Sequence, residues 1–255
     1  MAVALITGGT SGIGAAFARA LAARGFDLVL VARDEQRLAA EAARYRAGGR
    51  RVETLSADLS VRADVARVAA RLADSADPVV LLVNNAGFSV GARLLDADTA
   101  PHDRAMEVMI RAVLVLSGAA ARAMRTRGRG DIINVSSTAG FITMGAYSAI
   151  KAWVTTYTES LAVELHGSAV RVLALCPGWV HTEFHVRGGV SVSGIPRALW
   201  VDADTLVADA LRDLTRGRVI SVPTLRYKAL IFLARHGPRA GIRSVSRRIS
   251  GGRER

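Results

Sequence analysis

A tyrosine and a lysine four positions apart, Tyr147 and Lys151, are the residues of this chain best suited to proton transfer. On a helix this spacing places both side chains on the same face, one turn apart. The charge of a nearby lysine favours the phenolate form of a tyrosine, whose pKa is ordinarily about 10. The spacing therefore predicts a tyrosine that exchanges a proton near neutral pH. Two serines, Ser136 and Ser137, lie about ten residues upstream.

A glycine-rich turn near the N-terminus is the second feature that indicates chemistry. It reads Thr7-Gly8-Gly9-Thr10-Ser11-Gly12-Ile13-Gly14 and follows a short apolar run. Glycines allow a tight backbone path and the close approach of a pyrophosphate to the N-terminus of the next helix. Together with the tyrosine and the lysine, the turn predicts a hydride-transfer site that uses a dinucleotide.

The chain around these features has the pattern of an α/β protein. Short apolar runs alternate with longer amphipathic stretches, which is typical of a parallel sheet covered on both faces by helices. We expect strands at residues 2–6, 27–32, 51–56, 79–83, 130–135, 169–175 and 218–222. We expect helices at residues 13–24, 34–47, 61–74, 101–127, 146–166 and 202–214.

A single domain is expected over residues 1–255, because no repeat or low-complexity linker divides the chain. Its core covers about residues 1–222. Glycines, serines and a proline interrupt the pattern at about residues 182–200, which predicts a lid or substrate loop beside the carboxyl ends of the strands. A basic C-terminal extension covers about residues 223–255.

Four motifs together resemble the short-chain dehydrogenase/reductase family. They are the T-G-x-x-x-G-x-G turn, Asn84-Asn85-Ala86-Gly87 after the fourth expected strand, Tyr147-x-x-x-Lys151, and Pro177-Gly178 after the sixth. The resemblance covers roughly residues 3–185, in the family's order. It implies a single Rossmann-like doubly wound sheet of about seven parallel strands, with helices on both faces, that interconverts a carbonyl and an alcohol.

The resemblance also implies the roles of individual residues. Tyr147 exchanges the proton of the reacting oxygen, Lys151 lowers its pKa and binds the nicotinamide ribose, and Ser137 orients the substrate oxygen. Asp58 holds the adenine, unless it is only a helix cap. The cofactor-binding residues implied are Thr7, Gly8, Thr10, Ser11, Gly12, Ile13, Gly14, Arg33, Asp58, Leu59, Asn85, Ala86, Gly87, Tyr147, Lys151, Pro177, Gly178, Val180 and Thr182.

The end of the second expected strand, Ala32-Arg33-Asp34, bears on the choice of cofactor. Enzymes that use NAD place an acid there that binds both ribose hydroxyls, whereas enzymes that use NADP supply a cation for the 2′-phosphate. Ala32 stands at the position of the acid and Arg33 follows, so we expect NADP(H). Asp34 leaves an alternative: turned toward the ribose it would favour NAD, but it also suits the N-cap of the next helix.

Two positions depart from the family's pattern. The family usually has an asparagine in the middle of the fourth helix, where the bent backbone holds a water that relays protons to the lysine. This chain has Met109 there, and a thioether cannot replace an amide donor. The stretch from Ser137 to Tyr147 is also shorter than usual, so Ser136 is an alternative to Ser137.

The expected substrate pocket is mostly apolar or aromatic. Its members are Ser89, Phe141, Ile142, Thr143, Trp179 and Phe184. Pockets of this composition bury hydrophobic ligands, so we expect an apolar ketone, aldehyde or alcohol as the small-molecule substrate. The same aromatic residues also suit the packing of a core or lid.

Positive charge is concentrated in the C-terminal part of a chain whose formal net charge is +12. No acidic residue lies between Leu214 and Arg253, and ten basic residues do. This stretch predicts a solvated or subunit-facing tail or, alternatively, peripheral contact with an anionic membrane. No nucleic-acid-binding motif accompanies the charge, so nucleic acid is not an expected partner.

Other features of the sequence limit location and assembly. We expect a cytoplasmic protein, because the lone Cys176 cannot form an internal disulfide, no signal peptide is evident, and no apolar run approaches the roughly 18 residues of a membrane span. The family resemblance implies a homo-oligomer, either a dimer or a tetramer. His181, Glu183 and His185 lack the spacing of His-Glu-x-x-His, so no metal site is expected.

Two functions remain open at this point. The first is an NADP(H)-dependent short-chain dehydrogenase/reductase acting on an apolar substrate. The second is an NADP(H)-sensing binding protein with little or no turnover, which the missing asparagine favours. Retention of Ser137, Tyr147 and Lys151 together favours the enzyme, because a sensor needs no proton donor.

Overall fold

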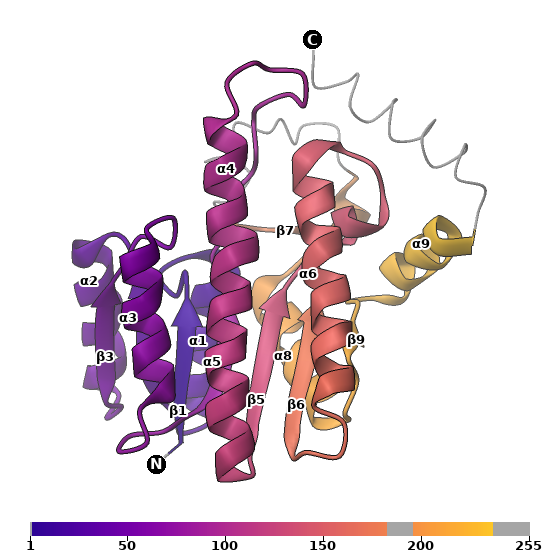
Figure 1. Ribbon diagram of the computed structural model, residues 1–255. Coiled ribbons are helices and arrows are strands. Elements are labelled where there is room, and N and C mark those ends of the chain that lie inside the picture. The colour runs from indigo at the N-terminus through magenta and orange to yellow at the C-terminus, as the bar shows by residue number, and fades with distance from the viewer. Residues whose placement is uncertain (1, 183–195, 237–255) are drawn as a thin grey trace.

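The computed structural model describes residues 2–182 and 196–236 and shows a parallel sheet at the centre of the protein (Figure 1). Its strands are β1 (Val3–Thr7), β2 (Asp27–Ala32), β3 (Val52–Ser56), β4 (Val79–Asn84), β5 (Gly130–Val135), β6 (Val170–Leu175) and β9 (Ile220–Ser221). The seven strands are ordered β3-β2-β1-β4-β5-β6-β9, and their pairings are parallel. The predicted α/β, Rossmann-like fold class is therefore confirmed.

Helices cover both faces of the sheet, as its buried strands require. They include α1 (Gly12–Ala23), α2 (Glu35–Ala47), α3 (Arg62–Ala73), α5 (Ala112–Arg127), α6 (Gly145–Glu164) and α8 (Ala203–Thr215). Side chains of β1 alternate between the two layers. Val3 and Leu5 pack with α3, α5 and α6, whereas Ala4 and Ile6 pack with α1, α2 and α8.

The helix expected over residues 101–127 is not a continuous α-helix. It is divided into α4 (Ala100–Met106), the π-helical turn η1 (Glu107–Arg111) and α5. At the end of η1 the N–H of Ala112 donates to the carbonyl of Glu107, five residues back, so the turn holds one residue more than an α-helical turn. Apolar spacing did not reveal this extra residue, because the buried Val108 and Met109 fit either helical period.

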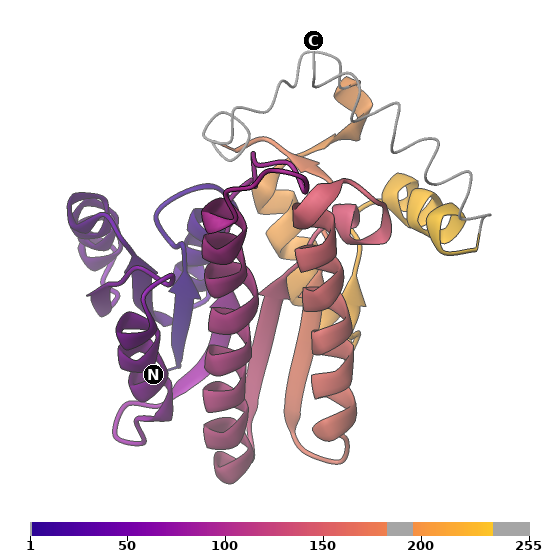
Figure 2. The ribbon, with the colours of Figure 1, turned by 45° about the horizontal axis from the view of Figure 1, so that its top comes forward.

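Three short elements complete the described chain. Strands β7 (Trp179–Val180) and β8 (Trp200–Val201) pair as a separate two-stranded sheet, which the sequence pattern did not predict because two residues show no alternation. Helix α9 (Leu225–His236) follows β9 and packs at the side of the domain (Figures 1 and 2). Residues 183–195 of the expected lid and residues 237–255 of the basic extension lie outside the described residues.

The topology fixes where a ligand can bind. All strands of the main sheet run the same way, so their carboxyl ends share one edge, at the top of Figure 1. The chain proceeds outward from β1 through β2 to β3 on one side, and from β4 onward on the other. The connections after β1 and β4 therefore diverge, which opens a crevice between them at that edge. Among the described residues, no helix is both long and apolar enough to cross a membrane.

Candidate active site

A cleft of about 1120 Å³ opens at the carboxyl ends of the strands, across the point where the strand order reverses. Most of the predicted site residues line it. They are Gly8, Thr10, Ser11, Gly12, Ile13, Arg33, Asp58, Leu59, Asn85, Ala86, Gly87, Ser89, Ser137, Ile142, Tyr147, Lys151, Pro177, Gly178, Trp179, Val180 and Thr182. The fold thus brings together residues that are spread over 175 positions of the sequence, from Gly8 to Thr182.

The glycine turn is shaped by left-handed backbone and close packing. Gly8 and Gly12 have φ angles of +67° and +54°, which side chains rarely tolerate. A Cβ atom on Gly14 would lie 2.1 Å from the carbonyl oxygen of Gly8, and one on Gly12 would lie 3.2 Å from Cβ of Thr182. Gly14 is therefore required beneath the turn, although it does not line the cleft itself.

Asn85 and Thr7 hold the turn against the end of β4. The Asn85 side chain donates to the carbonyl oxygens of Thr7 and Gly8 at 3.0 and 3.2 Å. The Thr7 hydroxyl oxygen accepts from the backbone N–H groups of Asn85 and Ala86 at 2.9 and 3.1 Å. Thr7 is buried and lies behind the cleft wall, so its contribution is to hold the loops that form the wall.

The N-terminus of α1 is suited to an anion. The backbone N–H groups of a first helical turn have no partner within the helix, and the helix dipole adds positive potential. Within the described chain, the N-cap Ser11 makes no side-chain capping bond and the first turn of α1 contains no acidic residue. These donors face the cleft through Gly12 and Ile13, so the residues present fit the pyrophosphate of a dinucleotide.

At the end of β2, a cationic side chain lines the cleft, whereas the neighbouring carboxylate is engaged as a helix cap. Arg33 lines the cleft with its side chain 67% exposed. The Asp34 carboxylate accepts from the backbone N–H of Arg37 at 3.0 Å, which makes it the N-cap of α2. This is the bond expected if Asp34 caps the helix. A carboxylate held this way is not turned toward a ribose, and Ala32 offers none.

Two further arginines that the sequence did not single out join Arg33 in the cleft wall. They are Arg37, from the first turn of α2, and Arg104, from α4. Arg104 donates to the Asp58 carboxylate at 2.8 Å, and Arg33 lies 4.0 Å from the same oxygen. Burial raises the pKa of Asp58, but its hydrogen bonds with Ser60 and the charge of Arg104 outweigh this and hold the pKa below its usual value.

Tyr147 lies in the wall of the cleft near Ser137. Burial raises the pKa of the phenol to about 12, and a hydrogen bond with the Ser137 side chain acts in the opposite direction. The net shift is upward, so the expectation that the adjacent lysine brings this pKa toward neutrality stays a prediction. The penalty of charging a buried phenol exceeds what its neighbours provide.

Lys151 is itself buried. Its ammonium lies 5.7 Å from the centre of the Tyr147 ring and donates to the backbone carbonyl of Val135 at 2.8 Å. Burial lowers the pKa of Lys151 from 10.5 to about 8. The spacing did place both side chains in one cleft, but a carbonyl at the end of β5 holds the amine.

The two candidate serines have different surroundings. The Ser136 hydroxyl is buried and bonded to the carbonyl oxygen of Lys151 and to the hydroxyl of Thr155, both at 2.7 Å. The Ser137 hydroxyl accepts from the N–H of Ala139 at 3.1 Å, donates to the carbonyl of Pro177 at a longer 3.4 Å, and remains beside Tyr147. The geometry therefore favours Ser137 as the serine available to a substrate, and Ser136 as a tie between β5 and α6.

Met109 lies in the π-helical turn η1 and packs toward the lysine. Its side chain is 1% exposed. A Cβ atom on Gly87 would lie 3.1 Å from the Met109 sulfur and 3.7 Å from the Lys151 amine, so the three groups meet behind the cleft. The bent backbone that the family resemblance leads one to expect here is present as a π-helical turn, although the amide side chain is absent.

The substrate end of the cleft contains only part of the expected set. Ser89, Ile142 and Trp179 line the cleft, together with the apolar residues Phe88, Val90, Val108 and Met144. Phe141 and Thr143 are not among the lining residues. The Phe141 ring instead lies 5.0 Å from the Arg235 guanidinium of α9, and Phe184 lies outside the described residues. The sequence could not place Phe141, because its neighbour on α9 is 94 positions away.

Tyr227 of α9 supports this end of the cleft from behind. Its hydroxyl accepts from the backbone N–H of Trp179 at 2.9 Å and donates to the carbonyl of Leu199 at 2.6 Å, which ties β7 to the residue directly before β8. Its ring occupies the space beside Gly178, where a Cβ atom would lie 1.9 Å away. His181 stacks on Trp200 with 4.4 Å between ring centres, while Glu183 and His185 lie outside the described residues.

Comparison with known proteins shows that the chain is similar to a large group of oxidoreductases. The family profile for short chain dehydrogenases matches residues 2–188. NovJ, a short-chain reductase protein of Streptomyces niveus, is 32% identical over 254 residues, which cover 98% of this chain and 93% of NovJ.

Solved structures give the same result. A short-chain dehydrogenase from Sphingobium yanoikuyae in complex with NADPH is 37% identical, with a TM-score of 0.84 over 93% of this chain and 94% of that one. A bulky-bulky ketone specific alcohol dehydrogenase from Comamonas testosteroni is 30% identical, with a TM-score of 0.80 over 93% of each chain.

Proposed function

The chain belongs to the short-chain dehydrogenase/reductase family of oxidoreductases that act on alcohols and carbonyls with a nicotinamide cofactor, and we propose that it interconverts an apolar ketone or aldehyde and its alcohol with NADP(H). The observation that carries the proposal is the meeting of Ser137, Tyr147 and Lys151 in a cleft that also contains the glycine turn. A cleft that only sensed a nucleotide would not need these three groups at its far end.

The preference for NADP(H) rests on the charges at the end of β2. Arg33, Arg37 and Arg104 line the cleft, and the Asp34 carboxylate is engaged as a helix cap. An adenosine 2′-phosphate would meet cations here, whereas the ribose hydroxyls of NAD would find no acid at Ala32. The NADPH complex of the Sphingobium yanoikuyae relative supports the same choice.

The chemistry follows from three side chains. A bound nicotinamide supplies the hydride, or accepts it in the reverse direction. Tyr147, with a pKa of about 12, holds its proton at neutral pH and can donate it to a carbonyl oxygen that gains charge. The Ser137 hydroxyl, beside the phenol, orients that oxygen. The Lys151 amine, with a pKa of about 8, stays mostly protonated at pH 7 and lowers the cost of phenolate when the proton leaves.

The apolar substrate class rests on the lining of the far end. The apolar residues Phe88, Val90, Ile142, Met144 and Trp179 line the same cleft as Tyr147. Burial of apolar surface is their main contribution to binding, and few polar groups are present to fix a polyol. The relative from Comamonas testosteroni, named for bulky ketones, is consistent with this class.

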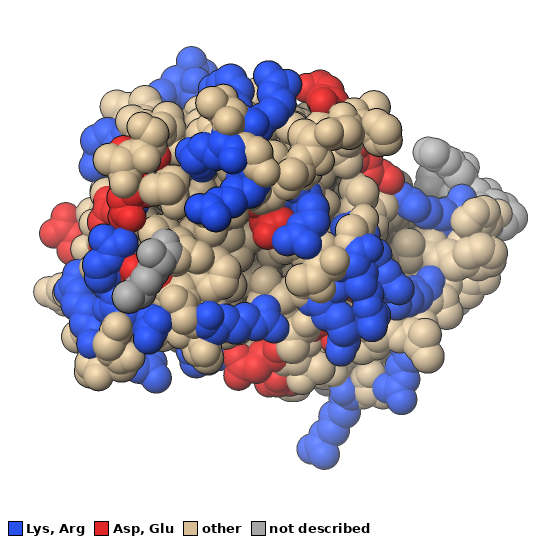
Figure 3. Space-filling view, turned by 90° about the horizontal axis from the view of Figure 1, so that it is seen from below, with Lys and Arg blue, Asp and Glu red and all other residues tan. Residues whose placement is uncertain are grey.

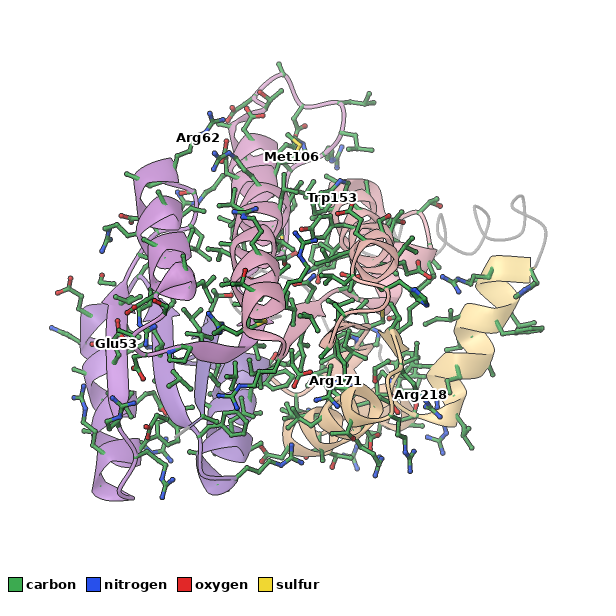
Figure 4. All side chains as sticks on the ribbon, turned by 60° about the horizontal axis from the view of Figure 1, so that its bottom comes forward. Glu53, Arg62, Met106, Trp153, Arg171 and Arg218 are labelled. Atoms are coloured by element: carbon green, nitrogen blue, oxygen red, sulfur yellow. The ribbon has the colours of Figure 1, made fainter. Side chains whose placement is uncertain are left out.

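A homo-oligomer, either a dimer or a tetramer, is part of the proposal. The outer faces of α5 and α6 expose Leu114 and Val163, at 47% and 75%. On α6, Trp153 stacks on Tyr157 with 4.8 Å between ring centres (Figure 4). Exposed apolar groups beside a half-buried aromatic pair on adjacent helices suit a subunit interface. Light scattering after gel filtration measures the mass, and Leu114→Arg with Val163→Arg should yield the monomer.

The test of function is consumption of NADPH with a panel of apolar ketones and aldehydes, beside NADH and with cofactor binding measured in the same samples. Tyr147→Phe should lower kcat/KM about 10²–10⁴-fold and leave the Kd for NADPH unchanged, because only the proton donor is removed. Tyr157→Phe is the matched control, since its hydroxyl donates to the carbonyl of Leu114 at 3.4 Å and does not line the cleft. Tight NADPH binding without turnover of any substrate would favour the sensor instead.

A further inference from the structure

Helix α9 has an apolar face that points away from the domain. Its inner face is formed by Tyr227 and Ile231, which are 5% and 8% exposed. Leu225, Phe232 and Leu233 are 81%, 61% and 65% exposed. The helix stands at the side of the domain in Figure 1, and Figure 4 shows side chains that project from it away from the sheet. Leu230 of the same helix is 49% exposed, and a helix that was only part of the core would not leave four large apolar groups in water.

The positions of these residues around the helix axis make one stripe. At 3.6 residues per turn, Phe232, Leu225 and Leu233 fall within a sector of about 100°, opposite Tyr227 and Ile231. Cations border the stripe on both sides, with Arg226 at one edge and Lys228 and Arg235 at the other. This is the arrangement of an interfacial helix, whose cations reach lipid headgroups while its apolar face enters the acyl boundary.

The charge around α9 favours an anionic surface. Residues 214–255 carry eleven of the 34 basic residues of the chain and one of its 22 acidic residues. Elsewhere the two signs are interspersed, and on the face seen from below acidic side chains lie among the basic ones (Figure 3). The 19 residues that follow α9, 237–255, add Arg239, Arg243, Arg247, Arg248, Arg253 and Arg255.

A second copy of this chain is a poorer occupant. In a two-fold symmetric interface each α9 would meet the other α9, or its immediate surroundings. Arg226, Lys228 and Arg235 would then face their own copies, and α9 contains no acidic residue to pair with them. Anionic lipid, in contrast, supplies both the apolar layer and the negative charge.

We propose that α9 docks this protein on anionic membrane surfaces through Leu225, Phe232 and Leu233. Lys228 and the remaining donor groups of Arg226 and Arg235, which also contact Ala198 and Phe141, would contact lipid phosphates. The contacts of α9 connect the docked surface to the wall of the cleft. Tyr227 supports Trp179, and Arg235 covers Phe141, next to Ile142 in the cleft wall. Docking therefore brings the substrate end of the cleft close to the bilayer. Delivery of an apolar substrate from the lipid rests on the proposed function, whereas docking itself does not.

The experiment is co-sedimentation of the full chain with vesicles of phosphatidylcholine alone and of phosphatidylcholine mixed with phosphatidylglycerol. The wild type should sediment with the mixed vesicles only. Phe232→Ser with Leu233→Ser should weaken this binding about tenfold or more, because two inserted side chains are lost. Val61→Ser with Met106→Ser is the matched control, since it removes two apolar groups that are 47% and 43% exposed, one directly before α3 and one at the end of α4.

Three results would overturn the proposal. The wild type fails to bind the mixed vesicles, or the double serine variant of α9 binds as well as the wild type, so that basic charge alone suffices. The third result is that the α9 variant loses a dimer seen by light scattering, and that neither protein binds vesicles. Turnover of a water-soluble ketone, measured in the same variant, should stay unchanged, which separates failure of docking from failure of the proposed function.

Discussion

The two ends of the cleft differ in what lines them, backbone at one end and side chains at the other. The cofactor end is made mostly of backbone: glycines in left-handed conformation, free N–H groups at the start of α1, and carbonyls held by Asn85. The substrate end is made of side chains from segments far apart, namely residues 88–90, 142–144, β7 and the supporting α9. A backbone site tolerates few substitutions and fits one kind of ligand, whereas a wall of side chains can change without disturbing the fold.

The largest effect is expected at the cofactor end, from Gly14→Ala. The added Cβ would lie 2.1 Å from the Gly8 carbonyl oxygen and 2.5 Å from the Asn85 amide, so the turn must move. Loss of its hydrogen bonds to the pyrophosphate should raise the Kd for NADPH about a hundredfold. Gly118→Ala in α5 is the control, because only the flexible end of Arg122 lies near. Fluorescence titration that gives a wild-type Kd for Gly14→Ala would contradict this account.

The arginines at the end of β2 should give the next largest effect. Arg33→Ser should raise the KM for NADPH about 10- to 100-fold, because the proposed charge-assisted bond to the 2′-phosphate is lost, and leave NADH unaffected. Arg44→Ser on α2 is the control, since Arg44 pairs with Glu41 at 3.1 Å and does not line the cleft. An equal loss with both cofactors would mean that Arg33 contacts something other than this phosphate.

The sequence predicts the backbone-built end of the cleft better than the end that is made of side chains. Residue type and spacing predict the glycine turn, Asn85 and Tyr147, because backbone constraints leave few alternatives. The role of Arg104 could not be predicted, because its partner Asp58 lies 46 positions away in the sequence. Arg104 also lies on a helix whose solvent-facing residues follow no recognisable pattern. The orientation of Lys151 toward Val135 was hidden for the same reason: a buried amine goes to the nearest carbonyl, which only the packed structure identifies.

Lys151 lies between the two ends and gives a test that needs no ligand. Its pKa is about 8 in the folded chain and 10.5 when unperturbed, so between these values the unfolded chain binds more protons and stability rises with pH. Below pH 8 the full cost of the buried charge is present. Lys151→Met should therefore be more stable than the wild type by about 1–3 kcal/mol at pH 7, after allowance for the unpaired Val135 carbonyl.

This advantage should shrink as the pH is raised from 8 toward 10.5. Urea unfolding of both proteins at each pH measures the difference. Titration of Tyr147, whose pKa of about 12 makes the folded state lose stability above pH 10, is common to both. Lys228→Met is the control, because Lys228 is the other lysine of the chain and is exposed. A stability gap that is constant with pH would show that packing, and not the buried charge, separates the two proteins.

The smallest effect, and the sharpest comparison, is expected from two neighbours at the substrate end. Ile142 lines the cleft, whereas the Phe141 ring lies 5.0 Å from the Arg235 guanidinium of α9. Ile142→Ala should raise the KM for an apolar ketone about three- to tenfold through lost burial, and Phe141→Ala should change it less than about twofold. Steady-state kinetics with one ketone ranks the two variants. The reverse ranking would mean that α9 withdraws from Phe141 when substrate binds, so that the ligand itself would assemble this wall of the cleft.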